Sequence, residues 1–392
     1  MMRVIYVSNL CLPQIYEDLF EDKRYKSSEA VQKYHRIMAE GFVLNDQEVI
    51  SLGVVPANKN VKKKFIILPD GELNGVKYKH LKTINLPIIK QALNAVNVCF
   101  NIIKLGNKKN SFVICDGLSY LASKAAVSVC RLKRIKTIVI ITDLPEFLVG
   151  NNRRAVKKYK RLFDEFFAYV LLTEKMAVRL GYMDKPYVVL EGQVDSREER
   201  KTGRKKQYNK KIIMYAGIVQ KLYGIKILVE GFIKADLNDY ELHIYGNGDY
   251  AEEIDKIGEI HKNIKHFPSQ SNSTVVEKEK EAYLLVNPRP TNEEYTKYSF
   301  PSKNMEYMVS GTAVLTTDLP GMPEEYKQYV YLIEDESVDG VCKVLKRISE
   351  ISDEEVLNKG RLAREFVLSE KNNKIQTKKI IELAIEKIYK KS

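Results

Sequence analysis

The sequence comprises 392 residues, of which 44% are hydrophobic and 29% charged, and it carries a formal net charge of +13. This length suggests two or three domains, and the composition indicates a soluble globular protein rather than a disordered or fibrous one. The positive charge is compatible with nucleic acid, an anionic membrane surface or phosphorylated ligands as partners, and equally with no partner.

The sequence disfavours membrane-spanning, secreted and metal-binding proteins. No apolar run reaches the roughly 18 residues of a membrane span, and the first eight residues predict a strand rather than a signal peptide. Five scattered cysteines without metal-ligand spacing predict reduced thiols in a cytoplasmic protein. The five histidines also lack such spacing, so we expect no metal site.

The first half of the chain alternates between predicted strands and helices. A strand at Arg3–Ser8 precedes a helix that begins at Ser27 or Ser28 and ends at Gly41. Further apolar segments predict a helix at 121–131 and strands at 49–55, 112–115, 136–142, 169–173 and 186–190. The pattern predicts a doubly wound parallel sheet within residues 1–195, and Asp143 directly follows one of its strands.

A basic segment, Asn151–Phe163, has two interpretations. It could lie on acidic lipid headgroups with its apolar side down, or it could be an ordinary amphipathic helix with a solvated basic face. We favour the second, because Val156, Tyr159 and Leu162 are spaced to pack on the sheet.

Residues 196–211 are almost free of apolar side chains and predict an exposed basic linker between two domains. The basic residues there are not interleaved with aromatic ones and form no recognisable binding module. We therefore expect no nucleic-acid partner.

The second half repeats the alternation. Strands are predicted at 212–216, 240–245, 264–267, 282–287, 312–316 and 330–333, with helices at 225–235, 250–257, 273–280, 350–365 and 373–389. Residues 212–370 thus predict a second Rossmann-like domain, and residues 371–392 a C-terminal helix able to pack back on the first domain. Two such domains place a cleft between the carboxyl edges of their sheets.

Three loops follow strands of the second domain, and the first two contain glycine. Gly217 with Lys221 forms the first, and Gly246 with Gly248 the second. The third leads into a helix and offers Ser302, Lys303 and exposed amides, all suited to an anion. Glu306 lies one turn into that helix and can accept from hydroxyl groups, so the three loops together suggest a nucleotide sugar.

These segments carry a family resemblance. Phe300, Glu306 and the pair Ser310-Gly311 match a motif of two glutamates and a helix that ends in a small residue and glycine. The stretches 215–224, 244–248 and 317–324 match the phosphate loop, the next strand end and the segment after the motif. The chain thus resembles the retaining GT-B glycosyltransferases that use nucleotide sugars. The stretches Ser27–Gln32 and Ser299–Lys303 are most similar to the branch that builds bacterial capsular and other surface polysaccharides.

The chain departs from this pattern at three positions. Tyr298 occupies the place of the first motif glutamate, although Glu293 and Glu294 lie a few residues upstream. Ile218 stands where the family has an arginine, and Lys221 is shifted by two residues from the family lysine. Lys303 or Arg289 could replace the missing positive charge.

The resemblance implies a donor site and a mechanism. The residues expected at the donor are Gly217, Lys221, Gly246, Gly248, Arg289, Glu294, Tyr298, Ser302, Lys303 and Glu306. Lys303 would stabilise the leaving diphosphate, and Asp143 would orient the acceptor hydroxyl, unless it caps a helix. Retaining enzymes of this class need no protein nucleophile, and no cofactor is implied beyond the donor substrate.

The expected acceptor is a glycan or a lipid-linked sugar, with the protein in the cytoplasm or peripheral at the inner face of the membrane. Two alternatives remain open at this stage. One is a nucleotide-sugar epimerase, and the other is a non-catalytic GT-B partner subunit, which Tyr298 and Ile218 favour.

Overall fold

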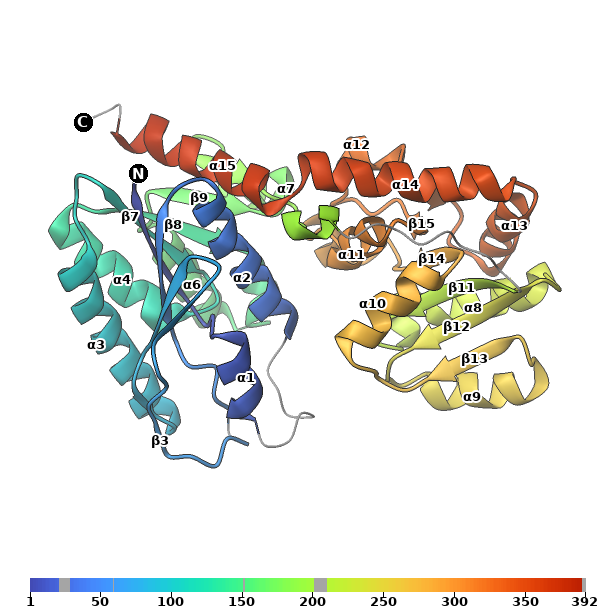
Figure 1. Ribbon diagram of the computed structural model, residues 1–392, viewed down its shortest axis with the longest axis horizontal. Coiled ribbons are helices and arrows are strands. Elements are labelled where there is room, and N and C mark those ends of the chain that lie inside the picture. Colours follow the sequence, from blue (N-terminus) through green and yellow to red (C-terminus); the bar gives the residue numbers. More distant parts are fainter. Residues whose placement is uncertain (21–28, 59, 151, 201–209, 390–392) are drawn as a thin grey trace. The chain divides into compact units, whose positions relative to one another are not determined.

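The computed structural model describes residues 1–392 except 21–28, 59, 151, 201–209 and 390–392 (Figure 1). The chain forms two compact units, Met1–Gln193 with Asn373–Ser392, and Val194–Asn372. We call them the N-terminal and C-terminal units. The predicted N-caps Ser27 and Ser28, Asn151 and most of the predicted linker lie outside the described residues.

The N-terminal unit is built on an eight-stranded sheet in the order β10-β9-β8-β7-β1-β2-β5-β4, parallel except for β4. Its strands are β1 (Arg3–Ser8), β2 (Glu48–Gly53), β4 (Gly71–Leu73), β5 (Val76–His80), β7 (Ser111–Asp116), β8 (Lys136–Ile141), β9 (Ala168–Leu171) and β10 (Tyr187–Val189). A separate antiparallel pair consists of β3 (Phe65–Ile66) and β6 (Thr83–Ile84). The helices are α1 (Pro13–Leu19), α2 (Glu29–Leu44), α3 (Pro87–Leu105), α4 (Tyr120–Lys133), α5 (Pro145–Leu148), α6 (Arg153–Phe163), α7 (Glu174–Leu180) and α15 (Asn373–Leu383).

The C-terminal unit has a six-stranded parallel sheet in the order β13-β12-β11-β14-β15-β16. Its strands are β11 (Lys211–Ala216), β12 (Tyr240–Tyr245), β13 (Ile264–Phe267), β14 (Leu284–Asn287), β15 (Ala313–Thr317) and β16 (Tyr331–Ile333). The α-helices are α8 (Ile225–Ala235), α9 (Ala251–Ile260), α10 (Asn272–Glu281), α11 (Ser302–Ser310), α12 (Glu324–Lys327), α13 (Val338–Ser349) and α14 (Asp353–Glu370). Two short 3₁₀ turns, η3 (Lys221–Tyr223) and η4 (Glu294–Lys297), lie in the loops after β11 and β14.

The strand order of this sheet fixes where a ligand can bind. The chain adds β12 and β13 on one side of β11, then returns to place β14, β15 and β16 on the other. Connections leave β11 and β14 in opposite directions, so a crevice opens between their carboxyl ends, which is where open α/β sheets bind ligands.

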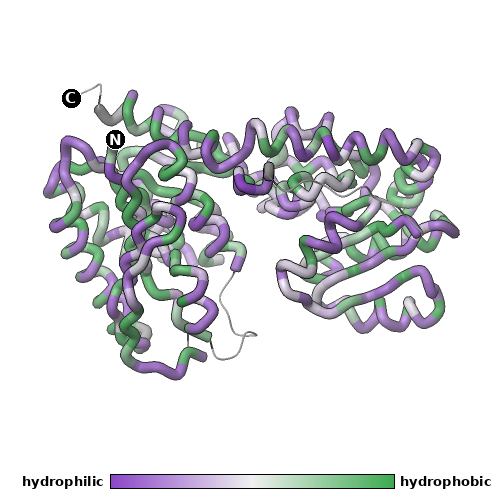
Figure 2. The backbone as a smooth tube through the Cα atoms, in the orientation of Figure 1, coloured by the Kyte–Doolittle hydropathy of each residue, from purple (hydrophilic) through white to green (hydrophobic). Residues whose placement is uncertain are grey.

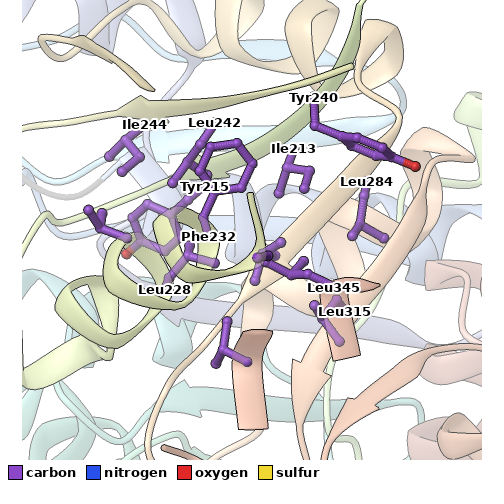
Figure 3. Close-up of a cluster of buried hydrophobic side chains, with 14 of the residues drawn as sticks. Ile213, Tyr215, Leu228, Phe232, Tyr240, Leu242, Ile244, Leu284, Leu315 and Leu345 are labelled. Atoms are coloured by element: carbon purple, nitrogen blue, oxygen red, sulfur yellow. The ribbon is translucent and has the colours of Figure 1, made fainter. Parts of the chain in front are cut away.

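The core of the C-terminal unit is apolar and closely packed (Figure 3). Leu228 and Phe232 of α8 are 0% and 1% exposed and belong to one buried cluster with Leu242 of β12 and Leu345 of α13. A Cβ added at Gly231 would lie 2.6 Å from a methyl of Val341, so the absence of a side chain lets α8 and α13 approach closely.

The helix α15 is part of the N-terminal unit although it ends the sequence. Ile380 is fully buried, and the side-chain amide of Asn373 donates to the carbonyl of Ile37 in α2 at 2.9 Å. The side-chain amide of Gln376 donates to the carbonyl of Gly192 at 2.7 Å. One face of α15 therefore completes the core against α2.

Gly41 provides a test of this packing. A Cβ at Gly41 would overlap the carbonyl oxygen of Asn373, so Gly41→Ala must displace α15. We expect a loss of about 1–3 kcal/mol in the free energy of unfolding, measured by urea denaturation with circular dichroism. An unhindered helix glycine would instead gain up to about 1 kcal/mol on the same change, so a rise in stability contradicts this packing. Glu29→Ala, at an exposed position of α2, is the control.

Candidate functional site

The three loops that the sequence singled out meet at the carboxyl edge of the C-terminal sheet. They follow β11, β12 and β14, two of which flank the crevice where the strand order reverses. The structure therefore brings together the loop segments that the sequence singled out.

The loops after β11 and β12 interlock through their backbones. Gly246 has φ 137°, and a Cβ at this residue would overlap the carbonyl oxygen of Gly217. A Cβ at Gly248 would overlap the carbonyl oxygen of Val219, whose N–H donates to Asn247 O at 3.0 Å. Glycine at 246 and 248 is thus required by the close approach of the two loops.

Buried hydrogen bonds attach α11 to the ends of three strands. The hydroxyl of Tyr307 accepts from the Ala216 N–H at 3.0 Å, at the end of β11. The side-chain amide of Asn287 donates to Asn304 at 2.7 Å, and that of Asn304 donates to the hydroxyl of Thr316 at 3.3 Å. Burial raises the pKa of Tyr307 well above its usual range, so its hydroxyl stays neutral. These positioning residues were not predicted from the sequence.

Lys303 lies over the first loop. Its Cε atom is 3.3 Å from the position that a Cβ on Gly217 would take, and its ammonium is 3.6 Å from the carboxylate of Glu306. Both side chains are about one-third exposed, at 35% and 29%. Ser302 is exposed at the first position of α11, and the N-cap residue Pro301 offers no side-chain cap to the first amides of the helix. A cation and a carboxylate therefore lie together at the start of α11, with the Lys303 side chain beside Gly217.

Arg289 joins the first loop to the third. Its guanidinium lies 4.9 Å from the ring centre of Tyr223 and 5.5 Å from that of Tyr295. The hydroxyl of Thr317 donates to the Arg289 carbonyl at 2.5 Å, which holds the backbone of this residue to the end of β15. A second cation is thereby fixed at the crevice by two aromatic faces.

The side chain of Lys221 is directed toward α9. Its ammonium is 2.5 Å from Glu253 of α9 and 5.3 Å from the ring centre of Tyr250. Its backbone N–H donates to Asp249 at 3.2 Å. The charge of Lys221 is therefore directed to α9, and Ile218, which occupies the family arginine position, is 55% exposed.

The upstream acids and the tyrosine at 298 lie along the third loop. Glu293 is half-buried and precedes η4, whereas Glu294 is exposed and begins it. Tyr298 ends η4 and is half-buried, with its N–H donating to Tyr295 O at 3.0 Å.

A cavity of about 380 Å³ opens on the side of this edge near α8 and α13. Its walls are Lys221, Leu222, Ile227, Pro288, Pro290, Asn292, Glu293, Thr317, Ile333, Glu336 and Val341. The carboxylate of Glu336, a residue that the sequence did not single out, accepts from the Thr291 N–H at 3.0 Å. The volume and the mixture of apolar walls with a few polar groups are typical of small-molecule pockets.

Asp143 belongs to the N-terminal unit. It is exposed just after β8, and its carboxylate accepts from the Thr142 hydroxyl at 2.9 Å. The N-cap residue of the following helix α5 is Leu144, without a side-chain cap, so the helix-capping interpretation of Asp143 is not supported.

The described residues contain no cluster of three or more metal-ligating side chains. Within the same part of the chain, no helix is both long enough and apolar enough to cross a bilayer.

Solved structures share this fold over nearly the whole chain. Sucrose-phosphate synthase from Thermosynechococcus elongatus has a TM-score of 0.71 and 12% identity, covering 100% of both chains. The lipopolysaccharide outer core galactosyltransferase WaaB has a TM-score of 0.63 and 14% identity, covering 99% of this chain and 100% of that one. Anabaena HepE in complex with UDP has a TM-score of 0.60 and 10% identity, covering 97% and 99%. The protein therefore has the predicted α/β fold, with two parallel-sheet units of the GT-B type.

A comparison of the sequence with protein-family models finds a similarity in the C-terminal unit. Residues 196–361 match the family model described as Glycosyl transferases group 1. Among curated protein sequences, none matches this chain. The C-terminal unit is thus similar to the group 1 glycosyltransferases in the segment that carries all three loops.

Asn304 tests how α11 is held. Asn304→Ala removes the acceptor of Asn287 and the donor to Thr316 in a site where all three side chains are at most 7% exposed. Because buried polar groups are left without partners, we expect a loss of about 1–3 kcal/mol in the free energy of unfolding. Ser302→Ala, at an exposed position of the same helix, should change stability little. Equal urea midpoints for Asn304→Ala and the unmodified protein would exclude this anchoring role.

Proposed function

We propose that this protein is a glycosyltransferase that moves a sugar from a nucleotide-diphosphate sugar to a glycan or lipid-linked acceptor. The observation that carries the proposal is the position of Lys303 over Gly217, beside the uncapped start of α11 and at the crevice between β11 and β14. The family match of residues 196–361 and the UDP complex of Anabaena HepE support the same class of donor.

In this proposal the donor diphosphate binds to the ammonium of Lys303 and the first amides of α11 near Ser302. Gly217, Gly246 and Gly248 let the backbone approach the phosphates, and Arg289 supplies a second cation from the opposite loop. Glu306 accepts from the ribose hydroxyls after its ion pair with Lys303 is rearranged. Lys221 joins the phosphates only if its ion pair with Glu253 opens.

The chemical step follows from where negative charge develops. As the glycosidic bond breaks, charge accumulates on the leaving diphosphate, and the fixed cation and amides stabilise it there. The acceptor hydroxyl attacks the face that the nucleotide leaves and passes its proton to the leaving diphosphate, which retains the anomeric configuration without a protein nucleophile. Asp143 orients that hydroxyl. Glu294, with the half-buried Tyr298, replaces the first motif glutamate at the sugar.

A role in bacterial surface polysaccharide synthesis is part of the proposal. It is supported by the sequence similarity of Ser299–Lys303 to that branch and by the lipopolysaccharide galactosyltransferase among the structural neighbours. A lipid-linked acceptor would bring the protein to an anionic membrane surface.

One alternative has a specific observation in its favour. Tyr298 and Ile218 replace two charged residues of the motif, and Lys221 is directed to α9. These features would also suit a non-catalytic partner subunit that keeps the fold. Such a subunit would bind nucleotide weakly or not at all and would transfer no sugar.

Nucleotide binding is expected to depend on Lys303. Removing a charge-assisted contact with a phosphate costs about 1.5–3 kcal/mol, so Lys303→Ala should weaken binding of the matching nucleotide diphosphate about 10- to 100-fold. Calorimetric titration with UDP, GDP and TDP measures this change. Lys226→Ala removes a cation of the same unit that is paired with Glu230 at 3.7 Å and should leave the affinity unchanged. Failure of all three nucleotides to bind would reject the proposed donor site.

The stereochemical outcome separates the enzyme from its alternative. With the nucleotide sugar that binds and a hydroxyl acceptor, we expect a product of the same anomeric configuration as the donor, identified by proton NMR coupling constants. An inverted product would refute the retaining mechanism. Weak donor binding without transfer to any acceptor, including water, would favour the partner subunit.

A further inference from the structure

The helix α3 exposes apolar side chains on its outer surface. Ile89, Val96, Phe100 and Ile103 are 44%, 65%, 64% and 56% exposed. At 3.6 residues per turn, these positions fall on one side of the helix and form a stripe about 21 Å long. We call them the α3 stripe.

The inner side of the same helix is apolar as well. Val98 and Ile102 are fully buried, so α3 has apolar residues around most of its circumference. Helices of that kind are normally covered on all sides. Figure 2 shows the chain coloured by hydropathy, with α3 among its more hydrophobic segments.

The α3 stripe continues at both ends into other exposed apolar side chains. Near the start of the helix, β3 pairs with β6, and the exposed neighbours are Phe65 (74%), Ile67 (70%), Leu86 (46%) and Ile88 (85%). At the other end, Leu132 of α4 is 85% exposed, and the ammonium of the adjacent Lys133 donates to the carbonyl of Ile103 at 2.5 Å. These residues add exposed apolar surface near both ends of the α3 stripe.

The sequence segment that contains α3 and α4 is predominantly basic. From Leu81 to Thr142 the sequence contains ten lysines and arginines and one acidic residue, Asp116, which is buried. The cations at the end of α3 and α4 are Lys104, Lys108, Lys109, Lys133 and Arg134. In the part of the chain that the structure describes, none of these five forms an ion pair with a carboxylate.

We propose that the α3 stripe and these five cations form a docking surface for an anionic lipid bilayer. Apolar side chains would enter the boundary between headgroups and acyl chains, while the cations contact lipid phosphates, the arrangement used by interfacial helices. A second copy of this chain would bring the same cations to the interface without acids to pair them. This inference extends the proposed function, in which a lipid-linked acceptor brings the protein to a membrane. It rests on that function for the choice of a bilayer as the partner.

The proposal places the membrane contact at α3 rather than at the basic helix α6. In α6 the apolar residues Leu162 and Phe163 are each 1% exposed, and Tyr159 packs edge-on against Tyr120 and Phe163. The apolar side of α6 thus faces the protein interior, as expected for an ordinary amphipathic helix. α6 offers cations, whereas α3 offers both cations and apolar side chains.

A fluorescence experiment can test this surface directly, because the sequence contains no tryptophan. In Phe100→Trp the new indole is the sole tryptophan and lies in the α3 stripe. Adding vesicles of phosphatidylcholine and phosphatidylglycerol should shift its emission to shorter wavelength, and vesicles of phosphatidylcholine alone should not. Val178→Trp, at a position of α7 that is also 64% exposed, should show no shift with either.

Co-sedimentation with the same vesicles measures the strength of binding. We expect Val96→Gln with Ile103→Gln to lower the vesicle partition coefficient at least about tenfold, because two apolar side chains no longer enter the bilayer. Val178→Gln with Met183→Gln, a pair of exposed apolar residues outside the stripe, should bind as the unmodified protein does.

Three outcomes would overturn the proposal. They are an unchanged emission of Phe100→Trp, equal binding of the stripe variant and its control, and a dimer in solution that Phe100→Glu dissociates without any vesicle binding. Binding of nucleotide to each variant is measured in parallel. Loss of vesicle binding with nucleotide binding intact removes only this inference, whereas vesicle binding without nucleotide binding removes only the proposed donor site.

Discussion

The attachment of α11 to the carboxyl edge of the C-terminal sheet is the constraint on which the candidate site depends. Asn304 is bonded to Asn287 at the end of β14 and to Thr316 in β15, and Tyr307 is bonded to the backbone at the end of β11. Each of these polar groups is buried, so breaking a bond would leave a donor or acceptor without water. The start of α11 is therefore fixed relative to the crevice where a ligand would bind.

Glycine and a single lysine turn this fixed geometry into an anion site. The close approach of the loops after β11 and β12 requires Gly246 and Gly248, and the Lys303 side chain lies over the backbone of Gly217. Because α11 cannot shift, Lys303 is held over that backbone without binding a ligand first. Preorganised charge of this kind is what stabilises a leaving phosphate most effectively.

Much of this fold could be predicted from the sequence, because parallel strands buried on both faces appear as short apolar runs. The bounds predicted for β12 and β13 coincide with those of the structure. The helix α3 was not predicted, although it is as amphipathic as α2. The amphipathic pattern of α13 was present in the sequence and was overlooked.

The candidate site could be predicted from the sequence only in part. The three loops could be found because glycine and charged residues after apolar runs mark the edge of a parallel sheet. Side-chain directions could not be found in this way. Lys221 and Lys303 both looked suited to phosphate, but the first is paired with Glu253 and the second lies over Gly217. Asn304 gave only a weak signal, as a polar residue on the buried side of its helix.

The central claim is that Lys303 and the first turn of α11 hold the diphosphate of a nucleotide sugar. A crystal structure of the protein soaked with the nucleotide diphosphate that binds in solution tests it most directly. The account predicts phosphate oxygens within hydrogen-bond distance of the Lys303 ammonium and the amides of Ser302 and Lys303, with the ribose at Glu306. A nucleotide bound away from α11, or phosphates held by Lys221 while Lys303 stays paired with Glu306, would contradict it.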